Sequence, residues 1–220
     1  MPNLPEKNVN AITNRKAVDL FNKLANTYRE RFFSVEAYQD PLFRFLAYLK
    51  NEASVLDVAC GPGNISHFLL KQKPGLKLTG MDLAPNMIQL AEQLNPDGSF
   101  LVHDAMEIDL LEESFDAITV GFLFPYLSKE QVELFIQKAW WKLNKHGILY
   151  LSTMEDLYEN SRIRTSSTGD EVMMYYYEST FLVNLLEKTG FQILLTHTQP
   201  YAVSDTETDT DLILIAAKIP

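Results

Sequence analysis

The stretch SVLDVACGPGNIS, residues 54–66, constrains the fold of this 220-residue chain more than any other. It begins as an apolar, β-branched run, passes through a loop with two glycines and leads directly into a helical pattern. That order predicts a buried strand, a tight turn and a helix N-terminus. Glycines let a ligand approach the backbone, and the unpaired N–H groups of a helix start can bind it. Asp57 lies inside the predicted strand, where a carboxylate is costly unless it is satisfied. We therefore interpret this stretch as the floor of a cofactor site.

The rest of the chain alternates between strand and helix patterns. Apolar runs predict further strands at residues 76–83, 99–103, 115–122, 148–153, 191–199 and 212–218. Helical spacing and capping residues predict helices from residue 13 onward and at residues 41–50, 64–72, 85–94, 128–143 and 179–188. We expect a loose tail over residues 1–12 and an irregular segment over residues 155–177.

This order of elements indicates an α/β fold. Strands that alternate with helices form a parallel sheet covered on both faces, as in a doubly wound fold. The last two predicted strands are joined without a helix, and such a connection makes an antiparallel pair. We therefore predict a seven-stranded sheet that is mostly parallel with an antiparallel last strand. No repeat or linker is apparent, so we expect a single domain.

Charge and composition limit the partners of the chain. The net charge is −10, and even the longest basic clusters are short, such as Lys71 with Lys73. Nucleic-acid binders, in contrast, carry a basic patch. We therefore expect a small-molecule substrate and no nucleic acid. No apolar run is long enough to span a bilayer, and the N-terminus lacks the apolar core of a secretory signal. Cys60 is the single cysteine, which excludes an internal disulfide framework. The expectation is a cytoplasmic protein with no membrane partner.

Two further carboxylates narrow the class of cofactor. Asp82 ends the second predicted strand, where it can accept both hydroxyls of a ribose or instead cap the helix that begins at Pro85. Asp104 follows the third strand and can accept from the amine of an adenine or lie in a solvated loop. Met87 can pack on a purine or simply belong to the core. In nicotinamide enzymes the loop is G-x-G-x-x-G, but here Ser66 replaces the third glycine.

Taken together, these motifs resemble a known family. VLDVACGPGN, GMDLAPNM and HDAMEIDL are similar to the first three motifs of class I S-adenosylmethionine-dependent methyltransferases of the small-molecule type. FDAITVGFLFPYLS, WWKLNKHGILYLS and LLEKTGF resemble later landmarks of that family in the same order. The resemblance covers roughly residues 13–220. It implies a Rossmann-like core over residues 51–220, with tail and lid helices over residues 1–50 of one methyltransferase domain.

The resemblance also implies roles for individual residues. Asp57 would orient the first loop and hold the cofactor's amino group, Asp82 would take the ribose hydroxyls, and Asp104 would read the adenine edge. Tyr28 would close over the site from the lid, although a core role suits it equally well. The full set implied to bind S-adenosylmethionine, with S-adenosylhomocysteine as product, is Tyr28, Asp57, Ala59, Gly61, Gly63, Asp82, Leu83, Met87, Asp104, Ala105, Met106, Gly121 and Phe122.

The acceptor side is less defined. Tyrosines that follow the fourth and fifth strands are candidates for substrate contact, because aromatic rings can enclose a flat or cationic group; each can equally be a core aromatic. These are Tyr126, Tyr158, Tyr175 and Tyr177. No catalytic base can be named, since a structural role suits each of the four histidines better. We expect no metal site, and we interpret the alternating acids Asp205, Glu207, Asp209 and Asp211 as a solvated hairpin loop.

Three functions are compatible with these patterns. The first is methyl transfer to a small-molecule acceptor by a monomer or homodimer. The second is a methyltransferase-like protein that binds the cofactor for regulation without turnover. The third is a nicotinamide oxidoreductase, which Ser66 and the terminal strand pair disfavour.

Overall fold

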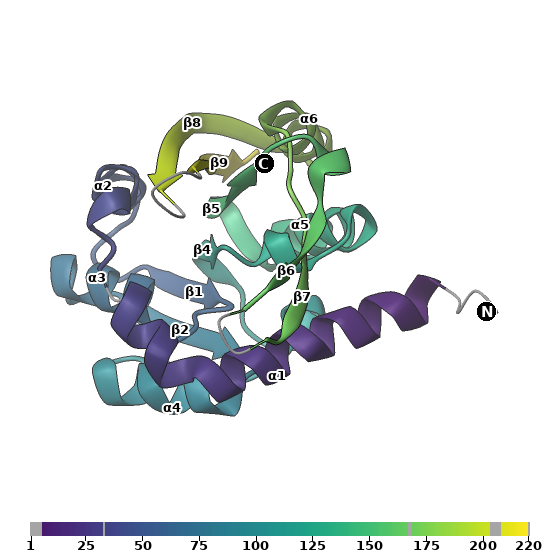
Figure 1. The fold of residues 1–220 in the computed structure, drawn as a ribbon. Helices are drawn as coiled ribbons and strands as arrows, with labels where there is room; N and C mark the ends of the chain where they lie inside the picture. The colour runs from purple at the N-terminus through teal and green to yellow at the C-terminus, as the bar shows by residue number, and fades with distance from the viewer. Residues whose placement is uncertain (1–5, 33, 167–168, 203–207, 220) are drawn as a thin grey trace.

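The computed structural model describes residues 6–32, 34–166, 169–202 and 208–219 (Figure 1). Its main sheet has seven strands in the order β3-β2-β1-β4-β5-β9-β8. The strands are β1 (Ser54–Val58), β2 (Lys77–Asp82), β3 (Ser99–Val102), β4 (Phe115–Gly121), β5 (Leu143–Glu155), β8 (Phe191–Ala202) and β9 (Thr208–Lys218). β9 runs antiparallel to both β5 and β8, whereas the pairs among β1 to β5 are parallel. The predicted α/β fold, including its sheet, is confirmed.

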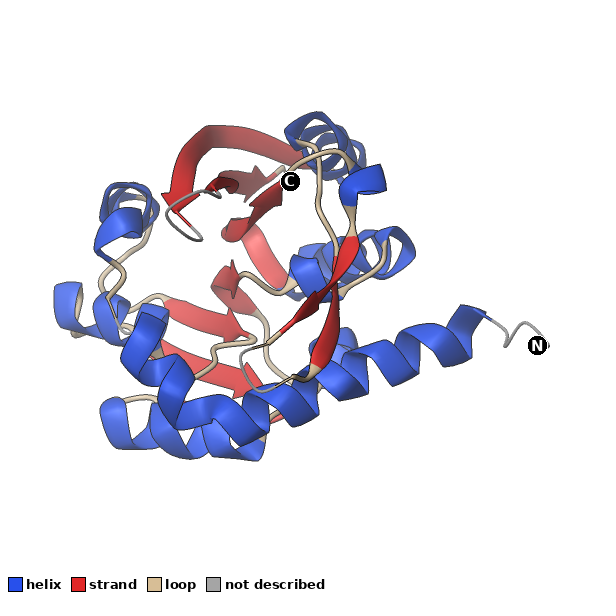
Figure 2. Ribbon diagram, in the orientation of Figure 1, coloured by secondary structure: helices blue, strands red, loops and turns tan. Residues whose placement is uncertain are grey.

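Helices cover both faces of this sheet (Figure 2). One face is packed by α2 (Gln39–Ala47), α3 (Asn64–Gln72) and α4 (Pro85–Leu94), and the other by the 3₁₀ segment η2 (Ala105–Leu110), α5 (Lys129–Lys142) and α6 (Ser179–Thr189). Local sequence explains several ends: Ser128 and Gln131 form a capping box at the start of α5, and Gly190 ends α6 in the left-handed region. Parallel strands place their carboxyl ends at one edge of the sheet, so the loops after β1 to β4 meet there.

The N-terminal region differs from the prediction. α1 (Glu6–Phe32) begins well before residue 13, and residues 6–12 belong to it rather than to a loose tail. Neither proline nor glycine occurs between Pro5 and Pro41, so nothing interrupts helix propagation once it has started. α1 runs across the front of the molecule, along α4 (Figure 1). A short 3₁₀ turn, η1 (Glu36–Tyr38), connects it to α2.

The segment predicted to be irregular contains a hairpin. β6 (Arg162–Thr165) and β7 (Glu171–Met174) pair antiparallel as a separate two-stranded sheet, after the short turn η4 (Tyr158–Asn160). Within the connection Gly169 has φ of +80°, and β-branched residues flank it on both strands. The signal was present in the sequence but weak, because each strand is only four residues long.

β5 also starts earlier than predicted, at Leu143. The strand is irregular near this start: His146 has φ of +63°, and the pairing with β4 shifts register between Phe115 and Ala117. Among the described residues, no helix is long and apolar enough to cross a bilayer.

Candidate active site

A pocket opens where the carboxyl ends of β1 to β4 meet. It encloses about 820 Å³ of empty space, its open mouth included. α1 forms one wall, the loops after the four strands form the floor, and the 3₁₀ turn η3 (Phe124–Tyr126) closes one end. The predicted cofactor residues that line it are Tyr28, Ala59, Gly61, Asp82, Leu83, Met87, Asp104, Ala105, Met106, Gly121 and Phe122.

Asp57 lies beneath the pocket rather than in its lining. Its carboxylate is 1% exposed and accepts from the hydroxyls of Ser66 at 2.6 Å and Thr119 at 2.8 Å. Burial raises the pKa of Asp57 to about 6, although both hydrogen bonds oppose the rise. The carboxylate therefore joins β1, α3 and β4, which agrees with the predicted orientation of the loop. Each of its two oxygens accepts one of these hydroxyl hydrogen bonds.

Asp82 occupies the centre of the floor. One carboxylate oxygen accepts from the Gly61 N–H at 3.0 Å and the other from the Ala84 N–H at 2.8 Å. Burial raises the pKa of this carboxyl, and these N–H groups counteract the rise. Burial also raises the pKa of the Tyr28 phenol to about 12, and the Asp82 charge adds to it. Asp82 thus supports the turn before α4 and lines the pocket, but it does not cap the helix, whose N-cap is Ala84 with no side-chain cap hydrogen bond.

The two glycines of the first loop have different surroundings. Gly61 has φ of +53°, lines the pocket, and has no atom within 4 Å of where a Cβ would lie. Gly63 has φ of +84°, and a Cβ there would lie 2.5 Å from Asn95 Nδ2 and 3.1 Å from Ala91. Gly61 therefore leaves room for a ligand, whereas Gly63 allows α3 and α4 to pack closely and does not line the pocket.

The loop after β3 contributes a second acidic group. Asp104 caps η2, since its carboxylate accepts from the Met106 N–H at 2.8 Å. His103 also lines the pocket, and its Nε2 lies 3.1 Å from the Glu107 carbonyl oxygen. Sequence reasoning assigned His103 only a structural role, because nothing in its spacing indicates which way the ring points.

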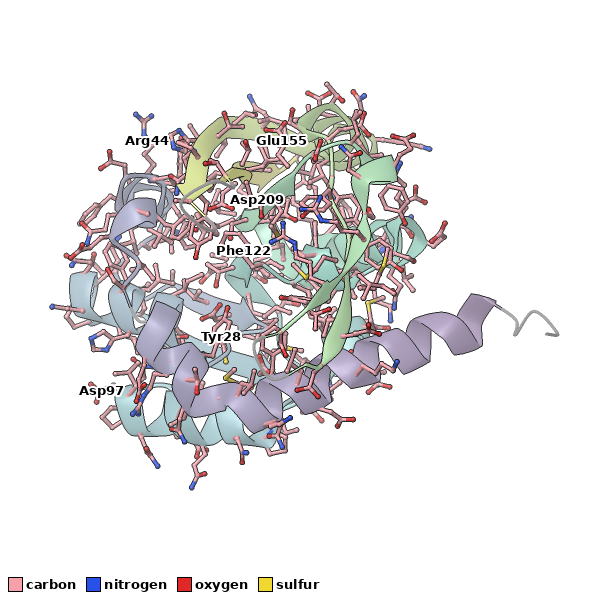
Figure 3. All side chains as sticks on the ribbon, in the orientation of Figure 1. Tyr28, Arg44, Asp97, Phe122, Glu155 and Asp209 are labelled. Carbon is pink, nitrogen blue, oxygen red and sulfur yellow. The ribbon has the colours of Figure 1, made fainter. Side chains whose placement is uncertain are left out.

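Phe122 marks the end of the pocket at β4. It has φ of +53°, which is uncommon for a bulky residue, and its N–H donates to the Ser152 carbonyl oxygen at 2.9 Å. Tyr126 lines the same end and contacts the ring of Phe21 at 5.1 Å between centroids. Figure 3 shows Tyr28 and Phe122 near the centre of the view, while Arg44 and Asp97 point outward at the rim.

The wall of the pocket that α1 forms contains residues that the sequence did not identify as site residues. Ala17, Val18 and Phe21 line the pocket next to Tyr28. Ala17 and Phe21, but not Val18, lie with Tyr28 on the apolar stripe that their helical spacing predicts, and the stripe alone does not distinguish packing on a helix from covering a pocket. Asn22 fixes α1 to α4: its Oδ1 accepts from the Asn86 N–H at 2.9 Å, and its carbonyl oxygen accepts from the Asn86 side chain at 2.8 Å.

Three of the four candidate acceptor tyrosines do not line the pocket. Tyr158 and Tyr175 stack at 5.8 Å, and Tyr177 packs beside them. A cation does approach these rings, but it is the protein's own: Lys129 Nζ lies 4.2 Å from the centre of the Tyr158 ring. Of the four, the structure brings only Tyr126 to the pocket.

Two of the four acids predicted to form a solvated loop near the C-terminus, Asp209 and Asp211, belong to a strand. Asp209 and Asp211 lie on β9 at the carboxyl edge of the sheet, and the Asp211 residue is 2% exposed. Arg164 of β6 binds both oxygens of Asp209, at 3.0 and 3.1 Å. Alternation of residue types, as on a strand with one buried face, is the sequence pattern that could have identified Asp209 and Asp211 as strand residues. Asp205 and Glu207 lie outside the described residues. In the part of the chain that the structure describes, no group of three or more His, Cys, Asp or Glu side chains could hold a metal ion.

Comparison with known proteins agrees with this geometry. Residues 55–147, which contain the loops after β1 to β4, match a family model described as a methyltransferase domain. This match covers less than half of the chain, and it supports the resemblance to class I S-adenosylmethionine-dependent methyltransferases.

Two curated relatives show how much of the chain is similar in sequence to known methyltransferases. The chain is 34% identical over 116 residues to a demethylmenaquinone methyltransferase of Thermotoga maritima, covering 51% of each protein. It is 29% identical over 191 residues to malonyl-[acyl-carrier protein] O-methyltransferase 1 of Ilyobacter polytropus, covering 84% of this chain and 70% of the relative. The chain thus spans about half the length of the demethylmenaquinone methyltransferase that it matches.

The methyltransferase fold extends through the whole chain. The structure of Burkholderia thailandensis 1,6-didemethyltoxoflavin-N1-methyltransferase superposes with a TM-score of 0.72 at 18% identity, covering 100% of this chain and 93% of the other. That structure contains its substrate and S-adenosylhomocysteine. At this identity the likeness concerns the fold.

Proposed function

We propose that this protein transfers a methyl group from S-adenosylmethionine to a small-molecule acceptor. One observation carries the proposal: among the described residues that line the pocket there are two carboxylates, Asp82 and Asp104, and neither lysine nor arginine. A dinucleotide would bring the negative charge of its pyrophosphate into this acidic pocket without a basic partner. S-adenosylmethionine brings a sulfonium and an ammonium group instead, and its ribose hydroxyls can donate to a carboxylate.

The lining residues fit the parts of that cofactor. Asp82 keeps lone pairs for ribose hydroxyls even while it accepts from two backbone N–H groups, because each carboxylate oxygen can accept more than once. Leu83 and Met87 supply apolar surface for the adenine, and Asp104 with the backbone of Ala105 and Met106 lies where its edge would be. Gly61 leaves open space for the methionine part.

The bound cofactor would supply a methyl group already activated by a positively charged sulfur. The protein therefore mainly aligns the two reactants and excludes water. α1 contributes by covering the pocket with Val18, Phe21 and Tyr28. Gly121 and Phe122 end β4 next to η3, and we place the transferred methyl group there.

The relatives support a small-molecule acceptor without naming it. Their names refer to demethylmenaquinone, malonyl-[acyl-carrier protein] and 1,6-didemethyltoxoflavin, so one fold serves several acceptor classes. Net charge and the single cysteine support our further proposal of a cytoplasmic protein, which acts as a monomer or homodimer.

Calorimetric titration with S-adenosylmethionine, S-adenosylhomocysteine and NADH tests the cofactor. We expect both adenosyl ligands to bind and NADH not to bind; binding of NADH alone would assign the pocket to an oxidoreductase. A transfer screen with labelled donor across phenols, amines, carboxylates and thiols then tests turnover. Cofactor binding without transfer to any class would favour the regulatory alternative.

A further inference from the structure

A buried carboxylate lies next to the pocket without belonging to it. Asp211 is on β9 opposite Met154 of β5, at the same edge of the sheet as the loops after β1 to β4. Its Oδ2 accepts a hydrogen bond from the Tyr38 hydroxyl at 2.7 Å, across 173 positions of sequence. We call these two residues the Tyr38–Asp211 pair.

The pair is connected to the pocket through aromatic rings. The Tyr38 ring contacts Phe122 edge to face, with 5.6 Å between centroids, and Phe122 lines the pocket. Tyr38 of η1 therefore lies beside the end of the pocket where β4 stops.

This carboxylate is less satisfied than those of Asp57 and Asp82. Asp57 accepts from two hydroxyls and Asp82 from two backbone N–H groups. Among the described residues, Tyr38 is the single donor to Asp211. A buried carboxylate normally has several hydrogen bonds or a basic partner, so Asp211 retains capacity to accept a proton.

The charges around Asp211 favour proton uptake. Burial raises the pKa of its carboxyl, and the neighbouring Asp209 charge adds to the rise, while the Tyr38 hydroxyl opposes it. Tyr150 of β5 also lies within electrostatic range. The nearby cation Arg164 is bound to both oxygens of Asp209, and it contributes no hydrogen bond to Asp211.

We propose that the Tyr38–Asp211 pair binds the hydroxyl of a neutral, aromatic acceptor and takes its proton during methyl transfer. This inference rests on the proposed methyltransferase function and names its substrate class as phenols. Carboxylate and phosphate acceptors are disfavoured by the acidic pocket, and a neutral amine needs no base before attack. A hydroxyl is the acceptor for which a buried, proton-accepting pair is useful.

The proton transfer balances in charge and atoms. The acceptor hydroxyl donates to the Tyr38 oxygen, whose own proton already points to Asp211. As the new O–CH₃ bond forms and the S–CH₃ bond breaks, the acceptor proton passes to Tyr38 and the tyrosine proton to Asp211. The ether, the thioether, Tyr38 and Asp211 are then all neutral. Tyr38 contacts the acceptor, and Asp211 acts through it as a positioning and proton-accepting residue.

Binding of 4-nitrophenol tests the pair without turnover. We expect the wild-type protein, with or without S-adenosylhomocysteine, to bind 4-nitrophenol at least tenfold more tightly than 4-nitroanisole, which has no proton to donate. Tyr38→Phe and Asp211→Asn should each weaken 4-nitrophenol binding by about 10–100-fold, as expected for a hydrogen bond to a charged group. Tyr48→Phe is the matched control, because Tyr48 is 50% exposed.

The ionisation of the bound probe separates this role from a structural one. Because a second negative charge beside Asp211 is unfavourable, the absorbance band of bound nitrophenolate should appear at higher pH in the wild type than in Asp211→Asn. Thermal unfolding and binding of S-adenosylhomocysteine should be unchanged in Tyr38→Phe. Equal binding of nitrophenol and nitroanisole, or an unshifted band in Asp211→Asn, would overturn the proposal. Failure of the wild type to bind S-adenosylhomocysteine would instead overturn the cofactor assignment.

Discussion

The two halves of the carboxyl edge of the sheet hold their carboxylates in different ways. In the half formed by the loops after β1, β2 and β3, Asp82 and Asp104 accept from backbone N–H groups close by in space, and Asp57 accepts from two hydroxyls. In the half formed by β8 and β9, Asp209 and Asp211 depend on side chains from distant segments, Arg164 of the separate hairpin and Tyr38 of η1. The first half is a shaped and satisfied surface, whereas Asp211 in the second half has Tyr38 as its single donor among the described residues.

The largest effect on stability is expected from substituting the two glycines of the loop after β1, which lies in the first half. Gly63→Ala should lower the free energy of unfolding by about 4 kcal/mol, since it combines left-handed strain with a clash against Asn95 and Ala91. Gly61→Ala is the matched control and should lower it by only about 1 kcal/mol, because its Cβ meets open space. Urea unfolding measures both; equal losses would contradict the division of roles.

The pH dependence of stability tests the buried carboxylate of the first half. The pKa of Asp57 is about 6 in the fold and 3.8 as its ordinary value, so the unfolded state binds fewer protons between these values and stability falls as pH rises through them. Asp57→Asn removes this pH-dependent contribution to stability while keeping the shape of the side chain. Its stability relative to wild type should therefore increase by up to about 3 kcal/mol from pH 4 to pH 7. A constant difference across this range would show that Asp57 keeps an ordinary pKa.

In the second half, the Arg164–Asp209 ion pair should matter for stability but not for the cofactor. Its side chains are 25% and 10% exposed, so Asp209→Asn should cost about 1–2 kcal/mol of unfolding free energy, between exposed and fully buried pairs. Affinity for S-adenosylhomocysteine, measured by calorimetry, should stay within twofold of wild type. A tenfold loss would mean that this half also shapes the cofactor site.

The smallest effect is expected at the aromatic cluster of Tyr158 and Tyr175. Lys129→Ala removes the cation over Tyr158, which is worth about 0.5–1 kcal/mol at an exposed site. Lys129→Arg is the matched variant, and it should retain most of that stability in thermal unfolding. If Lys129→Ala instead abolished methyl transfer, the cluster would belong to the active site after all.

This contrast also explains what could be predicted from the sequence. Asp57, Asp82 and Asp104 follow or lie within strands whose apolar runs are plain, so strand order alone brings them to one edge. The Tyr38–Asp211 contact joins residues 173 positions apart, and no local pattern indicates that pairing. The hairpin of β6 and β7 was missed for a similar reason, since strands of four residues give little periodicity.

Residues close in sequence can also differ in role. Gly61 and Gly63 belong to one motif, yet only Gly61 lines the pocket, because the packing of α4 against the loop decides the surroundings of Gly63. Likewise, the apolar stripe of α1 predicted a packed helix, but the three-dimensional placement of Ala17 and Phe21 shows that the same face covers a pocket. In both cases the role of the residue depends on tertiary packing, which a local sequence pattern does not show.

The most direct test of the account is calorimetric titration of S-adenosylhomocysteine into the wild-type protein and Asp82→Asn. We expect wild-type binding at one site per chain and a loss of about 10–100-fold in the variant, because the carboxylate accepts hydrogen bonds from ribose. Asp82 also supports the Gly61 and Ala84 N–H groups, so thermal unfolding of both proteins serves as the control for loop damage. No binding to the wild type, or equal affinity for Asp82→Asn, would contradict the assignment of this pocket.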